Sequence, residues 1–263
     1  MSRTLNLCEH LLAEGRRFHQ LGVDDRAERI FASLTRLRDL PGDIAEDTHY
    51  HLAELLLKKR KFASARRHLA AALAFAPQDA YYHYLMAAAY EDDRRGDRDL
   101  ALEHYRRALE LEPEEPMYHC DAGLFALRHG AVDEGLSYVR RAVELAPDDI
   151  EIIGEVVQGL QEINHFDEAR SIARAALFRN AENRQFQQLW NDCRFQELHA
   201  RQQRVRKKRM VRRAVAEGRI CLPFVQMTVE TPKGRKLIRT DGPSRTPPPH
   251  LLRFPRLSGK KHA

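Results

Sequence analysis

The feature that most constrains this chain is an internal repeat over its first 183 residues. Three segments align as helix ends closed by proline and acid: "LAAALAFAPQD" at 69–79, "YRRALELEPEE" at 105–115 and "VRRAVELAPDD" at 139–149. Their prolines are separated by 36 and 34 residues. Small residues keep nearly the same spacing, at Ala27, Ala65, Ala101, Gly135 and Ala169. A period of this length is typical of stacked supersecondary units.

Within each period the apolar residues recur at helical spacing in two runs, separated by short turns such as "QLGVD" and "RHGAVD". Each unit is therefore predicted to be a helical hairpin. Small residues permit close approach of its two helices, and the proline ends the second helix. Because one hairpin cannot cover its own apolar face, neighbouring units are expected to stack into a solenoid.

The repeats resemble the tetratricopeptide repeat (TPR) family over roughly residues 8–183. Five units are expected, at about 8–45, 46–79, 80–115, 116–149 and 150–183. The family's small first-helix residue is matched by Gly15, Ala53, Ala87 and Gly123, and its second-helix alanine by Ala72, Ala108, Ala142 and Ala176. The resemblance implies an all-α fold, a right-handed superhelical solenoid of TPR hairpins.

The resemblance also implies a concave face, lined by first helices, that binds peptides of other proteins. Projected onto that face, this sequence gives an aromatic and acidic groove formed by Tyr50, Glu54, Tyr81, Tyr84, Glu91, Asp121, Leu124 and Glu155. Such a groove favours a basic or amphipathic ligand. The tyrosines can instead pack between repeats, and the acids can form a solvated face. The sequence leaves both readings open.

Charge divides the chain unevenly. Residues 184–263 hold 20 Lys and Arg against 5 Asp and Glu, a net of +15, whereas residues 1–183 carry −9. The densest run is "RQQRVRKKRMVRR" at 201–213, with positive charges at Arg201, Arg204, Arg206, Lys207, Lys208, Arg209, Arg212 and Arg213. This basic segment is predicted to meet a polyanion. The candidates are nucleic acid, anionic lipid and acidic protein, including the chain's own repeat array. The segment can instead be a solvated charged helix without a partner.

The last third is expected to contain three parts. A helix over 184–217 begins as a cap for the array, with an apolar stripe in "RQFQQLWNDCRFQELHA", and continues as the basic segment. Residues 218–263 form a basic, proline-rich tail in which "FVQMTVE" and "RKLIRT" flank a turn, so a β-hairpin is expected at 224–240. The prolines between 243 and 255 favour an extended contact element.

No catalytic constellation is visible, and the chain is predicted not to be an enzyme. The "HYH" at 49–51 and the recurring His49, His83 and His119 are interpreted as structural because they share one register, so neither a metal site nor a cofactor is expected. The four cysteines form no paired motif, which fits a reducing setting. No transmembrane run or signal peptide is recognised, and the protein is expected to be cytoplasmic.

These observations predict a non-enzymatic adaptor or scaffold that mediates protein–protein interaction through its groove and carries a basic C-terminal arm. The alternative is a nucleic-acid-associated protein, binding RNA or DNA, in which the basic segment contacts phosphates. Adaptor binding is expected to survive nuclease treatment and moderate salt, whereas binding through phosphates is weakened by salt.

Overall fold

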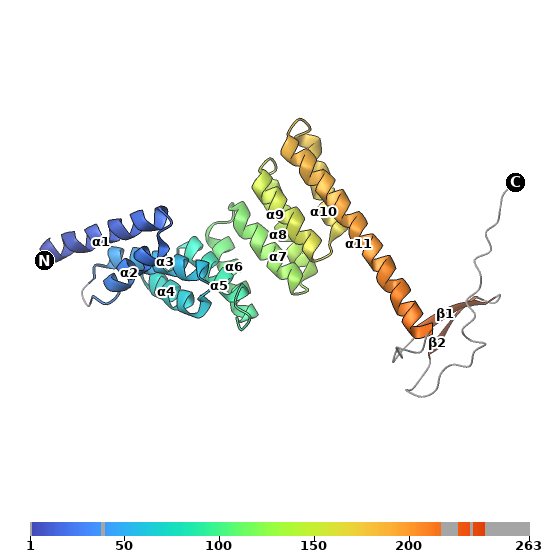
Figure 1. Cartoon of the computed structure of the whole chain (residues 1–263), viewed down its shortest axis with the longest axis horizontal. Helices are drawn as coiled ribbons and strands as arrows, with labels where there is room; N and C mark the ends of the chain where they lie inside the picture. The colour runs from blue at the N-terminus through green and yellow to red at the C-terminus, as the bar shows by residue number, and fades with distance from the viewer. Residues whose placement is uncertain (1, 38–39, 217–225, 232–233, 240–263) are drawn as a thin grey trace. The chain divides into compact units, whose positions relative to one another are not determined.

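The computed structural model describes residues 2–37, 40–216, 226–231 and 234–239. The chain forms two compact units, residues 1–198 and 199–263. The first unit consists of consecutive helical hairpins followed by the start of a long helix (Figure 1). None of the helices in the described part combines the length and apolarity needed to cross a bilayer.

Five hairpins follow one another along the first unit. They are α1 (Ser2–Gln20) with α2 (Asp24–Leu34), α3 (Gly42–Lys58) with α4 (Phe62–Phe75), α5 (Ala80–Glu91) with α6 (Arg98–Leu111), α7 (Pro116–Arg128) with α8 (Val132–Leu145), and α9 (Ile150–Glu162) with α10 (Phe166–Arg179). First helices of neighbouring hairpins also touch, as α1 touches α3 and α7 touches α9. These contacts bring the first helices of successive repeats onto one face.

The proline-and-acid segments found in the sequence separate one hairpin from the next. Each proline follows the end of a second helix, and the acid caps the helix that comes after it. The Asp79 side chain accepts a hydrogen bond from the backbone N–H of Tyr82 at 2.9 Å, and Asp149 accepts from Glu151 at 2.8 Å. Such caps satisfy backbone donors that the first helical turn leaves unpaired.

Four of the five turns inside the hairpins share one backbone feature, a residue with positive φ. Gly22 and Gly130, at equivalent turn positions, have φ of 72° and 87°. Arg60 and Asn164 occupy the same place in the second and fifth hairpins with φ of 56° and 67°. Glycine adopts this left-handed conformation without steric cost, whereas other residues are strained in it. The same turn geometry therefore recurs in these four hairpins, two of which do not supply glycine, whereas the longer turn of the third hairpin lacks it.

The periodic small residues lie where the helices of each hairpin meet. Ala27, Ala65, Ala101 and Ala169 are fully buried, and Gly135 is buried in the fourth hairpin. Around them pack larger apolar side chains, including Phe31, Tyr105 and Leu160. The core thus runs from hairpin to hairpin, as a stacked array requires.

Helix α11 (Arg184–Ala216) belongs to both units. Within the first unit, Phe186 and Cys193 are 1% and 2% exposed and share a core with residues of α9 and α10. Arg170 of α10 donates to Glu197 of α11 at 3.4 Å. The stretch expected to cap the array therefore packs on the fifth hairpin.

The second unit contains the basic segment of α11 and two strands. Strand β1 (Gln226–Thr231) pairs antiparallel with β2 (Gly234–Arg239), and Gln226 lies opposite Arg239. These strands fall within the β-hairpin expected at 224–240. The proline-rich stretch from 243 onward lies outside the described residues.

Candidate functional site

The tyrosines expected on the first-helix face form a chain of ring contacts. Tyr50 of α3 lies 6.0 Å from Tyr81 of α5, measured between ring centroids, and Tyr81 lies 5.9 Å from Tyr84. Tyr84 stacks on Tyr118 of α7 at 4.9 Å. Tyr81 is 37% exposed, whereas Tyr50 and Tyr84 are half-buried. The rings therefore join three hairpins, and Tyr81 is the most exposed of them.

Three acidic side chains gather beside these rings, on α5, α7 and α9. Glu91, Asp121 and Glu155 form what we call the carboxylate cluster. Asp121 and Glu155 each place an oxygen within 4.8 Å of the other and of Cys120 Sγ. Successive first helices thus contribute one acid each, although these acids are 30 or more residues apart in the sequence.

Hydrogen bonds hold two members of the carboxylate cluster in place. Tyr84 Oη donates to Asp121 Oδ2 at 2.7 Å, and Tyr105 Oη donates to Glu91 Oε2 at 2.6 Å. Arg128, at the end of α7, forms an ion pair with the other oxygen of Glu91. Two carboxylates are therefore fixed by neutral hydroxyl donors, and one arginine supplies positive charge.

The electrostatics of the carboxylate cluster favour protonation. Burial raises the pKa of Glu91 and of Asp121, even though Tyr105, Tyr84 and Arg128 act in the opposite direction. Burial and then the Asp121 charge raise the pKa of Glu155. A raised carboxyl pKa means that the negative form is destabilised in the folded protein. A cation placed here would relieve that cost.

Two residues expected in the same groove lie in different surroundings. Leu124 of α7 is 3% exposed and belongs to the core shared with α9. It occupies space left open by Gly159, since a Cβ there would lie 2.4 Å from Leu124 Cδ1. Leu124 therefore packs between hairpins and presents almost no surface to a ligand. Glu54 lies on α3 among histidines, apart from the carboxylate cluster.

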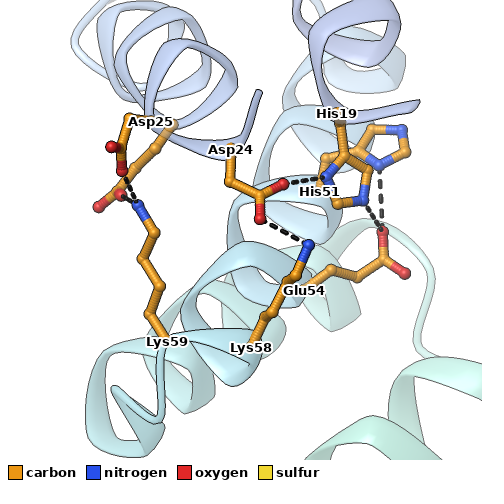
Figure 2. Close-up of polar contacts among 8 residues, drawn as sticks. His19, Asp24, Asp25, His51, Glu54, Lys58 and Lys59 are labelled. Carbon is orange, nitrogen blue, oxygen red and sulfur yellow. Dashed lines mark hydrogen bonds and ion pairs between the residues drawn. The ribbon is translucent and has the colours of Figure 1, made fainter. Parts of the chain in front are cut away.

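A second polar cluster connects the first two hairpins (Figure 2). Asp24 pairs with Lys58 at 2.6 Å, and Lys59 pairs with Asp25 at 2.6 Å and with Glu28 at 2.5 Å. Beside them, Glu54 contacts two imidazoles. We call this set the balanced cluster; its members are His19, Asp24, Asp25, Glu28, His51, Glu54, Lys58 and Lys59.

Acids of the balanced cluster behave oppositely to those of the carboxylate cluster. The hydrogen bond from Lys58 lowers the pKa of Asp24, and that from Lys59 lowers the pKa of Asp25. The pKa of Glu54 is also lowered: burial opposes ionisation, but hydrogen bonds from His51 and Tyr50 outweigh it. Sequence reasoning placed Glu54 in the groove and missed its two histidine partners. His51 lies three residues earlier on α3, and His19 comes from the preceding repeat.

The recurring histidines pair with second helices. His49 Nδ1 lies 2.9 Å from His68 Nδ1, and His83 Nδ1 lies 3.0 Å from His104 Nδ1. In the fourth hairpin His119 Nε2 contacts the carbonyl of Pro113 at 2.9 Å instead. The shared register thus places each histidine at a packing contact.

The basic segment, residues 201–213, lies in α11, and all thirteen of its residues are exposed. Its eight charged members are Arg201, Arg204, Arg206, Lys207, Lys208, Arg209, Arg212 and Arg213. Exposed cations at every turn of a helix create a strong positive potential, which attracts polyanions.

Stacked hairpins with small residues at the helix crossings define a helical repeat scaffold. Residues 86–150 match the family model described as Tetratricopeptide repeat. This match supports the assignment of the repeats to that family, and the all-α solenoid fold is confirmed. Interaction with protein partners is the general role of such a scaffold.

Solved structures support the same fold. One MamA protein shares 16% identity with a TM-score of 0.55, and the match covers 69% of this chain and 94% of that one. A thermophilic TPR protein from Thermus thermophilus shares 20% identity with a TM-score of 0.53, covering 72% and 99%. YrrB, described as a TPR protein with an unusual peptide-binding site, shares 16% with a TM-score of 0.53, covering 73% and 90%. Comparison with curated proteins gives no significant match.

Proposed function

We propose that this protein is a non-enzymatic adaptor that binds a basic, amphipathic segment of a partner protein at the carboxylate cluster. One observation carries the proposal: Glu91, Asp121 and Glu155 converge from three successive repeats in surroundings that destabilise their charges. A lysine or arginine from a partner would supply the missing countercharge. Binding would thereby relieve repulsion that is present in the free protein, which adds to the affinity.

The neighbouring aromatic residues account for the apolar half of the ligand. Tyr81 is exposed beside the carboxylate cluster and stacks on Tyr84, whose hydroxyl is bonded to Asp121. An apolar ligand side chain can rest on this ring, and a cation can lie over its face. A segment that alternates basic and apolar residues therefore suits the surface better than a uniformly basic one.

Binding of charge-matched peptides tests the proposal. We expect a synthetic amphipathic peptide of Lys and Leu to bind, and a Glu and Leu peptide of the same pattern not to bind. The double variant Asp121→Asn with Glu155→Gln removes two charges and should weaken Lys/Leu binding at least about tenfold, since a charged hydrogen bond contributes about 1.5–3 kcal/mol. Calorimetry at low and moderate salt gives the affinities.

A matched control keeps the net charge change but moves it elsewhere. Glu110→Gln with Glu144→Gln alters exposed acids of the second helices α6 and α8. This control should bind the Lys/Leu peptide like the unchanged protein. Equal weakening by both double variants would mean that overall charge alone attracts the peptide, and the site proposed here would be wrong.

The basic segment supports a second proposal, binding of nucleic-acid phosphates. Its eight cations all lie on exposed helix. We expect full-length protein to bind duplex DNA or single-stranded RNA with an affinity that falls steeply with salt. Changing Arg206, Lys207, Lys208 and Arg209 to Ser should lower both the affinity and its salt dependence, by about 0.9 in the logarithmic slope for each DNA phosphate that is no longer neutralised. Unchanged nucleic-acid binding would exclude this role and favour an acidic protein.

A further inference from the structure

Two imidazoles and a carboxylate converge between the first and second hairpins (Figure 2). Glu54 Oε2 lies 3.2 Å from His51 Nδ1 and 3.8 Å from His19 Nε2. One side-chain nitrogen or oxygen of each residue lies within 4.8 Å of the other two. All three residues are half-buried, so they are reachable from solvent but held in place by packing.

We propose that His19, His51 and Glu54 form a binding site for a divalent transition-metal ion, with zinc as the preferred ion. Two imidazoles and one carboxylate are a ligand set that zinc uses when it keeps a fourth position for solvent or substrate. Tetrahedral bonds of about 2.1 Å place the ligand atoms about 3.4 Å apart. The measured separations lie on either side of this value, so small side-chain rotations complete the site.

Chemistry of the donors argues against the hard cations. Imidazole nitrogen suits zinc, copper and nickel, whereas magnesium and calcium prefer oxygen ligands throughout. His51 and Glu54 lie three residues apart on one face of α3, and His19 comes from the last turn of α1. A bound ion would therefore tie the first repeat to the second.

Asp24 gives independent support. His19 Nδ1 faces Asp24 Oδ1 at 3.6 Å, and both atoms are buried without a hydrogen-bond partner. The other Asp24 oxygen is held by Lys58. In metal sites a carboxylate commonly accepts the proton of the imidazole nitrogen that faces away from the ion, which directs the second nitrogen to the metal. Asp24 is placed to do this for His19 Nε2.

Arg16 acts against metal binding. Its Nε lies 3.2 Å from His51 Nε2 and donates to it, which places the His51 proton on Nδ1, the atom that faces Glu54. Coordination through Nδ1 requires that proton to move to Nε2, where it would meet the Arg16 donor. Arg16 also pairs with Asp47, so its guanidinium can turn toward that carboxylate. Removing Arg16 should therefore strengthen metal binding.

The sequence predicts no metal site here, because the register that His49 shares with His83 and His119 indicates a structural role for the "HYH" at 49–51. His49 does pair with a second-helix histidine, His68. His51, two residues on, turns toward the preceding hairpin, where its ring also stacks on Phe31 with centroids 5.4 Å apart. The two histidines of one motif thus have separate surroundings.

Titration of the full-length chain with Zn²⁺ and with Co²⁺ tests the proposal. We expect saturable Zn²⁺ binding by calorimetry, and Co²⁺ absorption of the intensity typical of four-coordinate sites. His19→Gln and Glu54→Gln should each weaken binding at least about tenfold. His83→Gln, which alters a histidine of a different pair, should leave it unchanged. Absence of saturable binding, or equal binding by His19→Gln, would overturn the proposal.

Replacing one metal-binding side chain by another distinguishes loss of the site from misfolding of a variant. His51→Cys keeps a metal-binding atom on α3, so it should still bind Co²⁺ and should add an absorption band from thiolate coordination. The unchanged protein also contains thiols, among them Cys8, Cys120 and Cys193, which are buried. Its Co²⁺ spectrum therefore provides the reference for any thiolate band that does not come from position 51. An unchanged Co²⁺ spectrum in His51→Cys would place the ion elsewhere and overturn the assignment.

Two further variants test the outer residues. Asp24→Asn should weaken Zn²⁺ binding about ten- to a hundredfold, as loss of a supporting carboxylate does in other metal sites. Asp25→Asn is the matched control. Asp25 is the next residue of α2 after Asp24, and it pairs with Lys59 on the opposite side of the cluster from the histidines (Figure 2). Arg16→Gln should increase the affinity. If Asp24→Asn and Asp25→Asn had equal effects, Asp24 would have no specific role and the proposed second layer would be wrong.

Discussion

In the balanced cluster, Asp24, Asp25 and Glu28 each lie within ion-pair distance of a lysine, and Glu54 lies beside two histidines. In the carboxylate cluster, three acids share the charge of Arg128. Both clusters are built in the same way, from polar residues on successive hairpins. The first resembles a completed ion-pair network, and the second has an excess of negative charge that a ligand can neutralise.

Helix packing explains how one architecture gives both outcomes. Helices of neighbouring hairpins touch, as α2 touches α3 and α7 touches α9, so polar side chains at these contacts meet residues of the next repeat. Where the neighbour supplies Lys58 and Lys59, the acids of α2 are neutralised within the protein. Where the neighbours supply further acids, as on α7 and α9, the charges accumulate. The repeat therefore sets the positions, and the local residue choice sets the electrostatics.

The largest expected effect concerns the packing beneath the balanced cluster. Phe31 is fully buried and stacks on His51, and it fills the space beside Gly15. Phe31→Ala should lower the free energy of unfolding by about 3–5 kcal/mol, because it leaves a cavity that stacked helices cannot easily close. Phe178→Ala, at a residue that is 87% exposed, is the control and should change it by less than about 0.5 kcal/mol. Chemical denaturation measures both; similar losses would contradict the burial difference.

An identical substitution in the two clusters should have opposite effects. Asp24→Asn removes the charge that Lys58 stabilises, so the melting temperature should fall. Asp121→Asn removes a charge that burial destabilises, and its amide oxygen can still accept from Tyr84, so the melting temperature should stay the same or rise. Calorimetric melts of the two variants at neutral pH give the comparison directly. A fall of similar size in both would show that the carboxylate cluster is not destabilised by its own charge.

The sequence predicted the hairpin solenoid because its signals are local. Helical spacing, turn glycines and the proline and acid at helix ends all lie within a few residues of the helix or turn that they predict. The same reasoning placed Glu91, Asp121 and Glu155 on successive first helices, because the period predicts where each first helix lies. Side-chain partners depend on the tertiary packing between repeats, and the sequence predicts them less completely.

Leu124 and His51 illustrate what the sequence does not disclose. The burial of Leu124 depends on Gly159, 35 residues later, which leaves the space that the leucine enters. The orientation of His51 depends on Phe31 and on His19 of the preceding repeat. The repeat register places such residues near one another on adjacent helices. The side-chain rotamers that bring them into contact depend on the packing of several helices at once.

The histidine pairs should make the stability of the second and third hairpins sensitive to acid. Burial lowers the pKa of His49, His68 and His104. The unfolded chain then binds more protons than the folded one below about pH 6.5, so stability is retained above that pH and lost as the pH falls through the folded pKa values. The carboxylate cluster works in the opposite direction, because acids with raised pKa values stabilise the fold as they take up protons.

Melting temperatures recorded between about pH 7 and 5.5 test this sign. We expect a decrease toward the lower pH, and a shallower decrease in the double variant His68→Gln with His104→Gln. Hydrogen exchange resolves the location: α4 and α6 should lose protection on acidification before α8 and α10 do. A melting temperature that stays constant over this range, or falls equally in the double variant, would mean that the histidine pairs are not the acid-sensitive element.

The smallest effect on stability is expected for Glu155→Gln. This variant tests whether peptide binding depends on charge or on packing between repeats. Glu155 is exposed on α9, so Glu155→Gln should change the free energy of unfolding by less than about 0.5 kcal/mol. The same variant should nevertheless weaken binding of the basic amphipathic peptide, because Glu155 adds to the negative field around Asp121. Leu124→Ala should do the reverse, since it removes buried packing against α9 but no charge. Comparing the two variants by denaturation and by peptide calorimetry therefore distinguishes a ligand-binding surface from an inter-repeat contact, and a loss of peptide binding that follows stability in both would favour the second.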